Sequence, residues 1–108
     1  MEKIKQDKIR KLIETEKGLL LYFFSDDCAP CMALRPKIKE LFATEFPEIR
    51  LMLLNASELP ETAAGLGVFS SPTLIIFLDG SEFRRYGRNV SLAEIARDLE
   101  RPYRICFE

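Results

Sequence analysis

The segment LLLYFFSDDCAPC, residues 19–31, places two cysteines directly after a continuous apolar run. The run from Leu19 to Phe24 has the length and the aromatic content of a central β-strand that is covered on both faces. Apolar residues then recur at helical spacing from Ala29 to Phe46, so the cysteines are expected at the start of a helix. The unpaired N–H groups and partial positive charge of a helix start favour a thiolate there. The segment therefore predicts a strand, a redox-active dithiol and a helix in succession.

The patterns on either side predict an α/β fold, in which a central mixed sheet of about four strands is flanked by helices. An amphipathic helix over residues 3–16, ended by Gly18 as its C-cap, precedes the first strand. Ile49 to Leu54 indicates a second buried strand, parallel to the first through a right-handed crossover. The dithiol would then lie at the carboxyl end of a central parallel strand, where the reaction sites of open α/β sheets gather.

The second half of the chain predicts a short helix, a hairpin and a final helix. The short helix is expected over Glu58 to Leu66, and the strand Thr73 to Leu78 leads into an Asp79-Gly80 turn and a return strand over Glu82 to Tyr86. The two arginines of the return strand suggest a sheet edge.

Ser91 and Glu94 form a capping box for a helix that includes Leu92 and Leu99. We expect Pro102 to follow that helix and to leave residues 103–108 as a tail.

Composition narrows the function further. The 108 residues suit a single domain, residues 1–108, and the formal net charge of −1 favours neither nucleic acid nor an anionic membrane as a partner. The apolar runs are too short to cross a bilayer, and the N-terminus lacks the apolar stretch of a signal peptide, so the expected location is cytoplasmic. The absence of histidine excludes Ser-His and Cys-His hydrolase sites and the usual zinc ligand sets.

The positions of the two thiols suggest unequal roles in disulfide exchange. Cys28, at or just before the first helical residue, is the expected attacking thiolate, and Cys31, one turn further in, is the expected resolving thiol. Pro30 fits the first helical turn, where its missing N–H costs nothing. Two alternatives remain open: half of a zinc site, for which Cys106 is the one further thiol, or two unreactive buried cysteines.

The chain from Leu19 to about Leu99 resembles the thioredoxin family. The resemblance rests on features beyond the strand–dithiol–helix unit: Pro36 five residues after Cys31, Ser71-Pro72-Thr73 at the start of the third strand, the Asp79-Gly80 turn, and Gly87. It implies a Cys28/Cys31 dithiol that reduces protein disulfides, with no further cofactor and with a thioredoxin-reductase-like electron donor. We expect such a protein to act as a monomer.

The resemblance also assigns supporting roles around the dithiol. Pro72 corresponds to a cis-proline that packs against the disulfide, although the residues alone would favour an ordinary trans-proline. Ser71, directly before Pro72, would offer its backbone to the substrate strand. Thr73 directly follows Pro72 and is the third supporting residue of this segment. Ala29 stands where the family has a glycine between the cysteines.

Several departures from the family pattern concern the surroundings of the dithiol. Asp27 replaces the tryptophan that usually precedes the first cysteine. The negative charges of Asp26 and Asp27 are expected to raise the pKa of Cys28, unless both side chains simply face water. Either aspartate is also a candidate N-cap of the helix. Tyr22 and Leu53 stand where the family has a buried aspartate and its lysine partner, and the first strand of the family is expected to be absent.

These departures keep a second function open, an interaction or chaperone-like module with slow or vestigial redox activity. Cys106 is expected to be a small packed residue, with a second redox thiol as the alternative.

Overall fold

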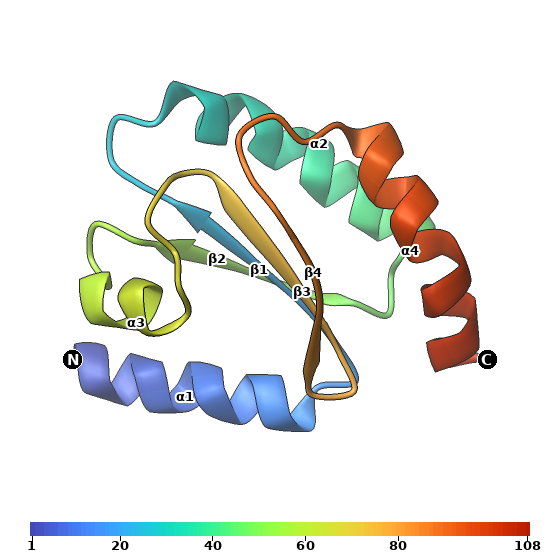
Figure 1. Cartoon of the computed structure of the whole chain (residues 1–108), viewed down its shortest axis with the longest axis horizontal. Helices are drawn as coiled ribbons and strands as arrows, with labels where there is room; N and C mark the ends of the chain where they lie inside the picture. The colour runs from blue at the N-terminus through green and yellow to red at the C-terminus, as the bar shows by residue number, and fades with distance from the viewer.

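A four-stranded mixed sheet lies between two layers of helices in the computed structural model, which describes residues 1–108 (Figure 1). The elements in chain order are α1 (Glu2–Thr15), β1 (Gly18–Phe24), α2 (Ala29–Glu45), β2 (Arg50–Asn55), α3 (Pro60–Gly65), β3 (Thr73–Leu78), β4 (Ser81–Tyr86) and α4 (Leu92–Phe107). The strand order is β2-β1-β3-β4; β1 and β2 run parallel, and the other neighbours run antiparallel. No strand precedes β1, as expected.

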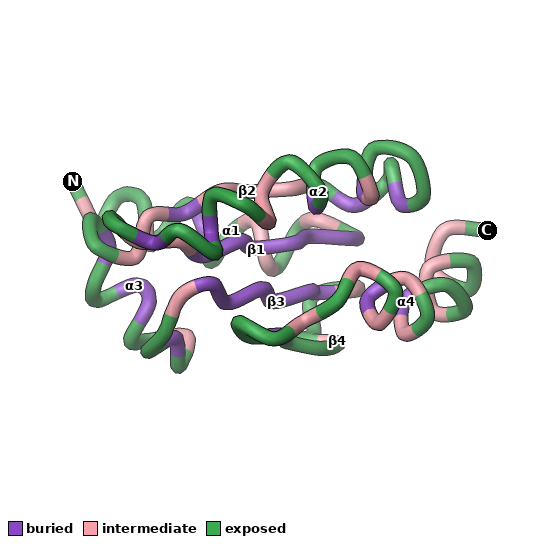
Figure 2. Tube along the Cα trace, turned by 90° about the horizontal axis from the view of Figure 1, so that it is seen from above, coloured by how far each residue is buried: buried purple, intermediate pink, exposed green.

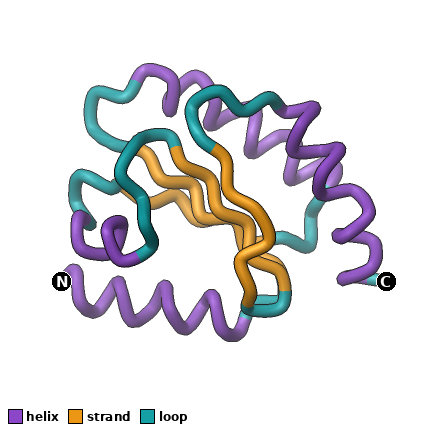
Figure 3. The backbone as a smooth tube through the Cα atoms, viewed as in Figure 1, coloured by secondary structure: helices purple, strands orange, loops and turns teal.

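Two apolar cores fill the space between the sheet and its helices. Figure 2 shows the buried residues concentrated along β1 and β3, and Figure 3 shows helices on both sides of the strands. Alternate residues of β1 point to opposite faces, so Leu20 and Tyr22 pack with α2 and α4, whereas Leu19 and Leu21 pack with α1 and α3. β1 and β3 are buried on both faces, which explains why their sequences are continuous apolar runs. These two strands and the hairpin turn lie where the sequence predicts them.

The expectation of a fully buried β2 is wrong. Only Leu54 of its six residues is buried, because β2 pairs with β1 alone and forms one edge of the sheet. β4 forms the other edge, as predicted. The turn that precedes β4 has positive φ angles at Asp79 (52°) and Gly80 (82°), the backbone conformation that an Asp-Gly turn favours.

The expected C-cap role of Gly18 is also wrong. Helix α1 ends at Thr15, its C-cap Glu16 is extended, and Gly18 is the first residue of β1. A Cβ at this position would lie 2.7 Å from the Phe107 ring and 2.9 Å from the Ile49 side chain. Glycine is therefore needed for close packing between the end of α4 and the sheet.

Helix α4 continues through Pro102 to Phe107, so the expected tail is helical instead. The Tyr103 ring packs on Phe46 and Phe107, with ring centroids 5.2 and 4.9 Å away. The Tyr103 hydroxyl also accepts a hydrogen bond from the Glu48 amide at 3.0 Å. This packing offsets the backbone hydrogen bond that Pro102 cannot donate.

The start of α4 agrees with the expected cap, since the Ser91 hydroxyl accepts a hydrogen bond from the Glu94 amide at 3.1 Å. None of the helices is both long enough and apolar enough to cross a membrane.

Candidate active site

The dithiol lies where β1 ends and α2 begins. Cys28 is the N-cap of α2, and its Sγ accepts a hydrogen bond from the Cys31 amide at 3.3 Å. The two sulfurs are joined in a disulfide, with the Cα atoms 5.3 Å apart. Cys28 keeps 9% of its surface exposed and Cys31 none, so the expected difference in accessibility is present. Cys28 itself caps the helix, which corrects the expectation that Asp26 or Asp27 would do so.

The two aspartates before Cys28 have different surroundings. Asp26 anchors its loop to the chain after β2: its amide donates to the Ser57 hydroxyl at 3.1 Å, and its carboxylate accepts from the Asn55 side-chain amide at 3.0 Å. Asp27 is exposed and has a φ of 60°, a left-handed conformation that aspartate tolerates better than most residues. The free negative charge beside the dithiol therefore belongs to Asp27.

Tyr22 lies beneath the dithiol and is fully buried. Its hydroxyl donates a hydrogen bond to the Cys31 carbonyl at 2.7 Å. Burial raises the pKa of Tyr22, and the positive charge of Arg35 offsets part of that rise. Tyr22 is also the register partner of Leu53 on β2, so no carboxylate–lysine pair exists at these two positions. A neutral phenol that holds the backbone of α2 takes the place of a titrating acid.

Arg35 follows Cys31 by one helical turn and was not singled out by the sequence. Its guanidinium lies over the Phe24 ring, 4.5 Å from the centroid, and its Nε is buried without a hydrogen-bond partner. This stacking holds a positive charge close enough to Tyr22 to affect its pKa.

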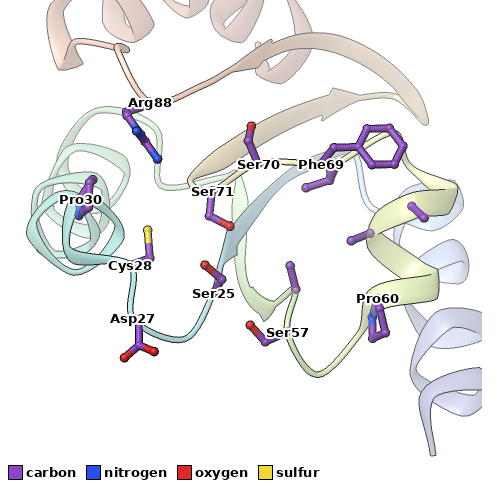
Figure 4. Close-up of a pocket in the computed structure, with 14 residues that line it drawn as sticks. Ser25, Asp27, Cys28, Pro30, Ser57, Pro60, Phe69, Ser70, Ser71 and Arg88 are labelled. Carbon is purple, nitrogen blue, oxygen red and sulfur yellow. The ribbon is translucent and has the colours of Figure 1, made fainter.

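A hollow opens beside Cys28 and separates it from α3 (Figure 4). Pro30 and Ser71 line this hollow with Cys28, so three expected site residues from two separate segments meet there. Ala29 lines a second hollow on the other side of Cys28, with Met32. The lining of the two hollows therefore comes mainly from α2, from α3 and from the loops that follow β1, β2, α3 and β4.

The other two expected site residues lie at the start of β3 and are buried. The Ser71–Pro72 peptide bond is cis, as the resemblance implies, and Pro72 does not line the hollow. The Thr73 hydroxyl donates to the Ser70 carbonyl at 2.8 Å and so supports the loop rather than facing the hollow.

Several residues that the sequence did not single out also line the hollow. Among them are Ser57, Phe69 and Arg88, from three different loops. Phe69 is 84% exposed, which is unusual for a phenylalanine. Only Arg88 had a sequence signal nearby, because it follows Gly87.

Cys106 lies at the opposite end of β1 from the dithiol, beside Lys17 and Asp79. Its Sγ is 3.6 Å from the Asp79 carboxylate and 3.9 Å from the Lys17 carbonyl. Burial raises the pKa of the Cys106 thiol, and the negative charge of Asp79 raises it further. These surroundings disfavour a thiolate and favour the packed role over a second redox thiol.

Comparison with known proteins agrees with this geometry. The thioredoxin family model matches residues 1–101. The thioredoxin-like protein YdfQ of Bacillus subtilis is 33% identical over 97 residues, which cover 90% of this chain and 86% of YdfQ. A thioredoxin of Chlamydia muridarum is 42% identical over 69 residues, covering 63% of this chain and 67% of that protein.

Solved structures give the same result for the fold. Thioredoxin 1 of Thermosipho africanus superposes with a TM-score of 0.74 at 31% identity, covering 83% of this chain and 99% of that one. No observation favours the alternative of an interaction or chaperone-like module with slow or vestigial redox activity. The chain therefore belongs to the thioredoxin family, and its Cys28–Cys31 pair makes it a thiol–disulfide oxidoreductase.

Proposed function

We propose that the protein reduces disulfides of protein substrates, with Cys28 as the attacking thiolate and Cys31 as the resolving thiol. The unequal exposure of the two sulfurs carries the proposal. Cys28 borders the open hollow at the N-terminus of α2, whereas Cys31 is fully buried. A thiolate at Cys28 would accept the Cys31 amide hydrogen bond and interact favourably with the helix dipole.

The reaction transfers two electrons in two exchange steps. The Cys28 thiolate attacks one sulfur of the substrate disulfide, which forms a mixed disulfide and releases the other substrate sulfur as a thiolate. After Cys31 loses its proton to solvent, its thiolate attacks the Cys28 sulfur. This step closes the Cys28–Cys31 disulfide and releases the second substrate thiolate. The substrate is reduced to a dithiol and the protein is oxidised.

The residues around the dithiol are proposed to support these steps. Ala29 begins α2, and Pro30 in the same first turn stiffens the link between the sulfurs. The Ser71 backbone would pair with an extended substrate segment in the hollow, while Pro72 and Thr73 hold the loop that presents it.

The proposed setting follows from the family and the reaction. The electron donor would be a thioredoxin-reductase-like protein. The protein would act as a monomer of one domain, residues 1–108, and would be located in the cytoplasm. That compartment is reducing, which favours net reduction of substrates. Neither nucleic acid nor a membrane is a proposed partner, in keeping with the net charge of −1.

Insulin reduction with dithiothreitol as the recycling reductant tests the proposal. Cys28→Ser should abolish turnover. Reduced Cys31→Ser, freed of dithiothreitol before it is mixed with insulin, should accumulate a mixed disulfide that is visible on non-reducing gels. Cys106→Ser is the matched control and should keep wild-type turnover, because this thiol lies at the other end of β1. Full turnover by Cys28→Ser would contradict the assignment of the attacking thiol.

A further inference from the structure

Arg88 places an unpaired positive charge at the rim of the hollow that contains Cys28. In Figure 4 its side chain points into the space between Pro30 and Ser71, above the Cys28 sulfur. Arg88 is exposed, donates no hydrogen bond and lies within 4.0 Å of no carboxylate. By contrast, Arg85 on the preceding strand forms an ion pair with Glu82 at 2.7 Å. The Arg88 guanidinium is therefore free to bind a ligand.

The position of Arg88 follows from the register of the sheet. Leu74 of β3 pairs with Tyr86 of β4, so the chain just before β3 and the chain just after β4 leave the sheet side by side. Ser71 belongs to the first of these segments and Arg88 to the second. A substrate segment that contacts the Ser71 backbone would consequently pass close to Arg88.

The two carboxylates near the dithiol, Asp26 and Asp27, form no ion pair with Arg88. The Asp26 carboxylate is held by Asn55 at 3.0 Å. The Asp27 side chain lies below Cys28 in Figure 4, and its carboxylate points away from Arg88. Both Arg88 and Asp27 therefore line the hollow, but they lie on opposite sides of Cys28, so the positive charge belongs to the side that Arg88 shares with Ser71.

We propose that Arg88 selects substrates that carry a carboxylate beside the disulfide that Cys28 attacks. The guanidinium group presents a planar fork of donors that matches a carboxylate and suits an acidic side chain on an extended segment. This inference rests on the proposed reduction of protein disulfides and adds a substrate preference to it. The occupant of the hollow is an acidic disulfide-containing polypeptide segment.

Single-turnover kinetics with a charge series of peptides test the preference. Three peptides share one sequence with an internal disulfide, and the residue next to the attacked cysteine is Glu, Gln or Lys. Pre-reduced protein is mixed with each peptide, and the second-order rate constants are compared. We expect the Glu peptide to react about two- to fivefold faster than the Gln peptide, the range of an exposed ion pair, and the Lys peptide to react more slowly.

Substitutions at Arg88 separate the proposed role from an effect on the thiolate. Arg88→Gln should remove the preference, Arg88→Glu should reverse it, and Arg88→Lys should keep most of it. Arg101→Gln is the matched control, because Arg101 is exposed on α4, forms no ion pair, and its loss changes the net charge equally. In 1 M salt, where the screening length is about 3 Å, the wild-type preference should largely disappear.

Two results would overturn the inference. Equal rates for the three peptides with wild-type protein would show that Arg88 selects no carboxylate. An equal slowing of all three peptides by Arg88→Gln would show that the charge acts on the Cys28 thiolate instead. Reduction of the neutral Gln peptide by wild-type protein tests the proposed function separately, and without it both proposals fail.

Discussion

Replacing Tyr22 with phenylalanine tests how the dithiol works without the family's buried carboxylate. The substitution removes one hydroxyl and the 2.7 Å hydrogen bond to the Cys31 carbonyl, and it leaves the ring in the core. In an α-helix the Arg35 amide donates to the carbonyl four residues earlier, so the Cys31 carbonyl is not expected to lose its last partner. The expected loss is therefore that of one neutral hydrogen bond, about 1 kcal/mol.

The measurement is urea unfolding of the oxidised protein. With an m-value of about 1–2 kcal/mol/M, a loss of about 1 kcal/mol moves the midpoint by about 0.5–1 M at unchanged slope. The corresponding fall in Tm is about 4 °C. Tyr103→Phe is the matched control, since it also removes one hydroxyl hydrogen bond, which joins Tyr103 to the Glu48 amide in the loop after α2.

The same variant should leave the chemistry intact. Burial raises the pKa of Tyr22, so its hydroxyl stays protonated at neutral pH, and its one proton is already donated to the Cys31 carbonyl. Tyr22 therefore does not remove the Cys31 proton. The rate at which Cys31 resolves a mixed disulfide should have the same pH profile, between about pH 6 and 9, in both proteins. A tenfold slower rate, or a profile displaced by a full pH unit, would refute this reasoning.

Three further substitutions test the packing and the charge of the fold. Gly18→Ala should destabilise the protein by about 1–3 kcal/mol in urea unfolding, because the new methyl group would lie 2.7 Å from the Phe107 ring. Pro102→Ala should raise the Tm and stabilise by about 1–3 kcal/mol, because it restores an amide donor inside α4. Glu82→Gln should lower stability by at most about 1 kcal/mol at pH 7. The Arg85 hydrogen bond lowers the pKa of Glu82, so this contribution is complete above the ordinary value of 4.5 and is lost as pH falls through the lower folded value.

Each of these substitutions has a control or a contrary result. Gly87→Ala should change stability by less than about 0.5 kcal/mol, since nothing lies within 4 Å of the added methyl group. A loss as large as that of Gly18→Ala would contradict the packing argument. Destabilisation by Pro102→Ala would mean that the aromatic contacts of α4 depend on the proline. A Glu82→Gln difference that persists at pH 2 would rule out the ion pair as its source.

Local sequence patterns were enough to predict the central part of the site. The apolar run up to Phe24 and the helical spacing after Ala29 predict β1, α2 and the position of Cys28 at the helix start, and all three are present. The hairpin at Asp79-Gly80 was equally accessible, because an Asp-Gly pair suits a turn with two positive φ angles. Such features depend on residues that are neighbours in the chain.

The surroundings of the site depend on residues that are far apart in the chain. Arg88 comes to lie at the hollow beside Cys28 through the pairing of β3 with β4. In the sequence only its neighbour Gly87, through the family resemblance, points to this region. The resemblance placed Ser71 near the dithiol, but local patterns did not reveal Ser57 or Phe69.

The sequence by itself determined the strand–dithiol–helix unit and with it the class of reaction. The tertiary structure decided where local preference gives way: Gly18 starts a strand instead of ending a helix, and α4 continues through Pro102. Both positions lie at the Phe107 end of α4, where the Phe107 ring packs closely over Gly18 and against Tyr103. This packing outweighs the tendency of glycine and of proline to end a helix. The structure also decided which charges border Cys28, because that depends on how distant strands pair.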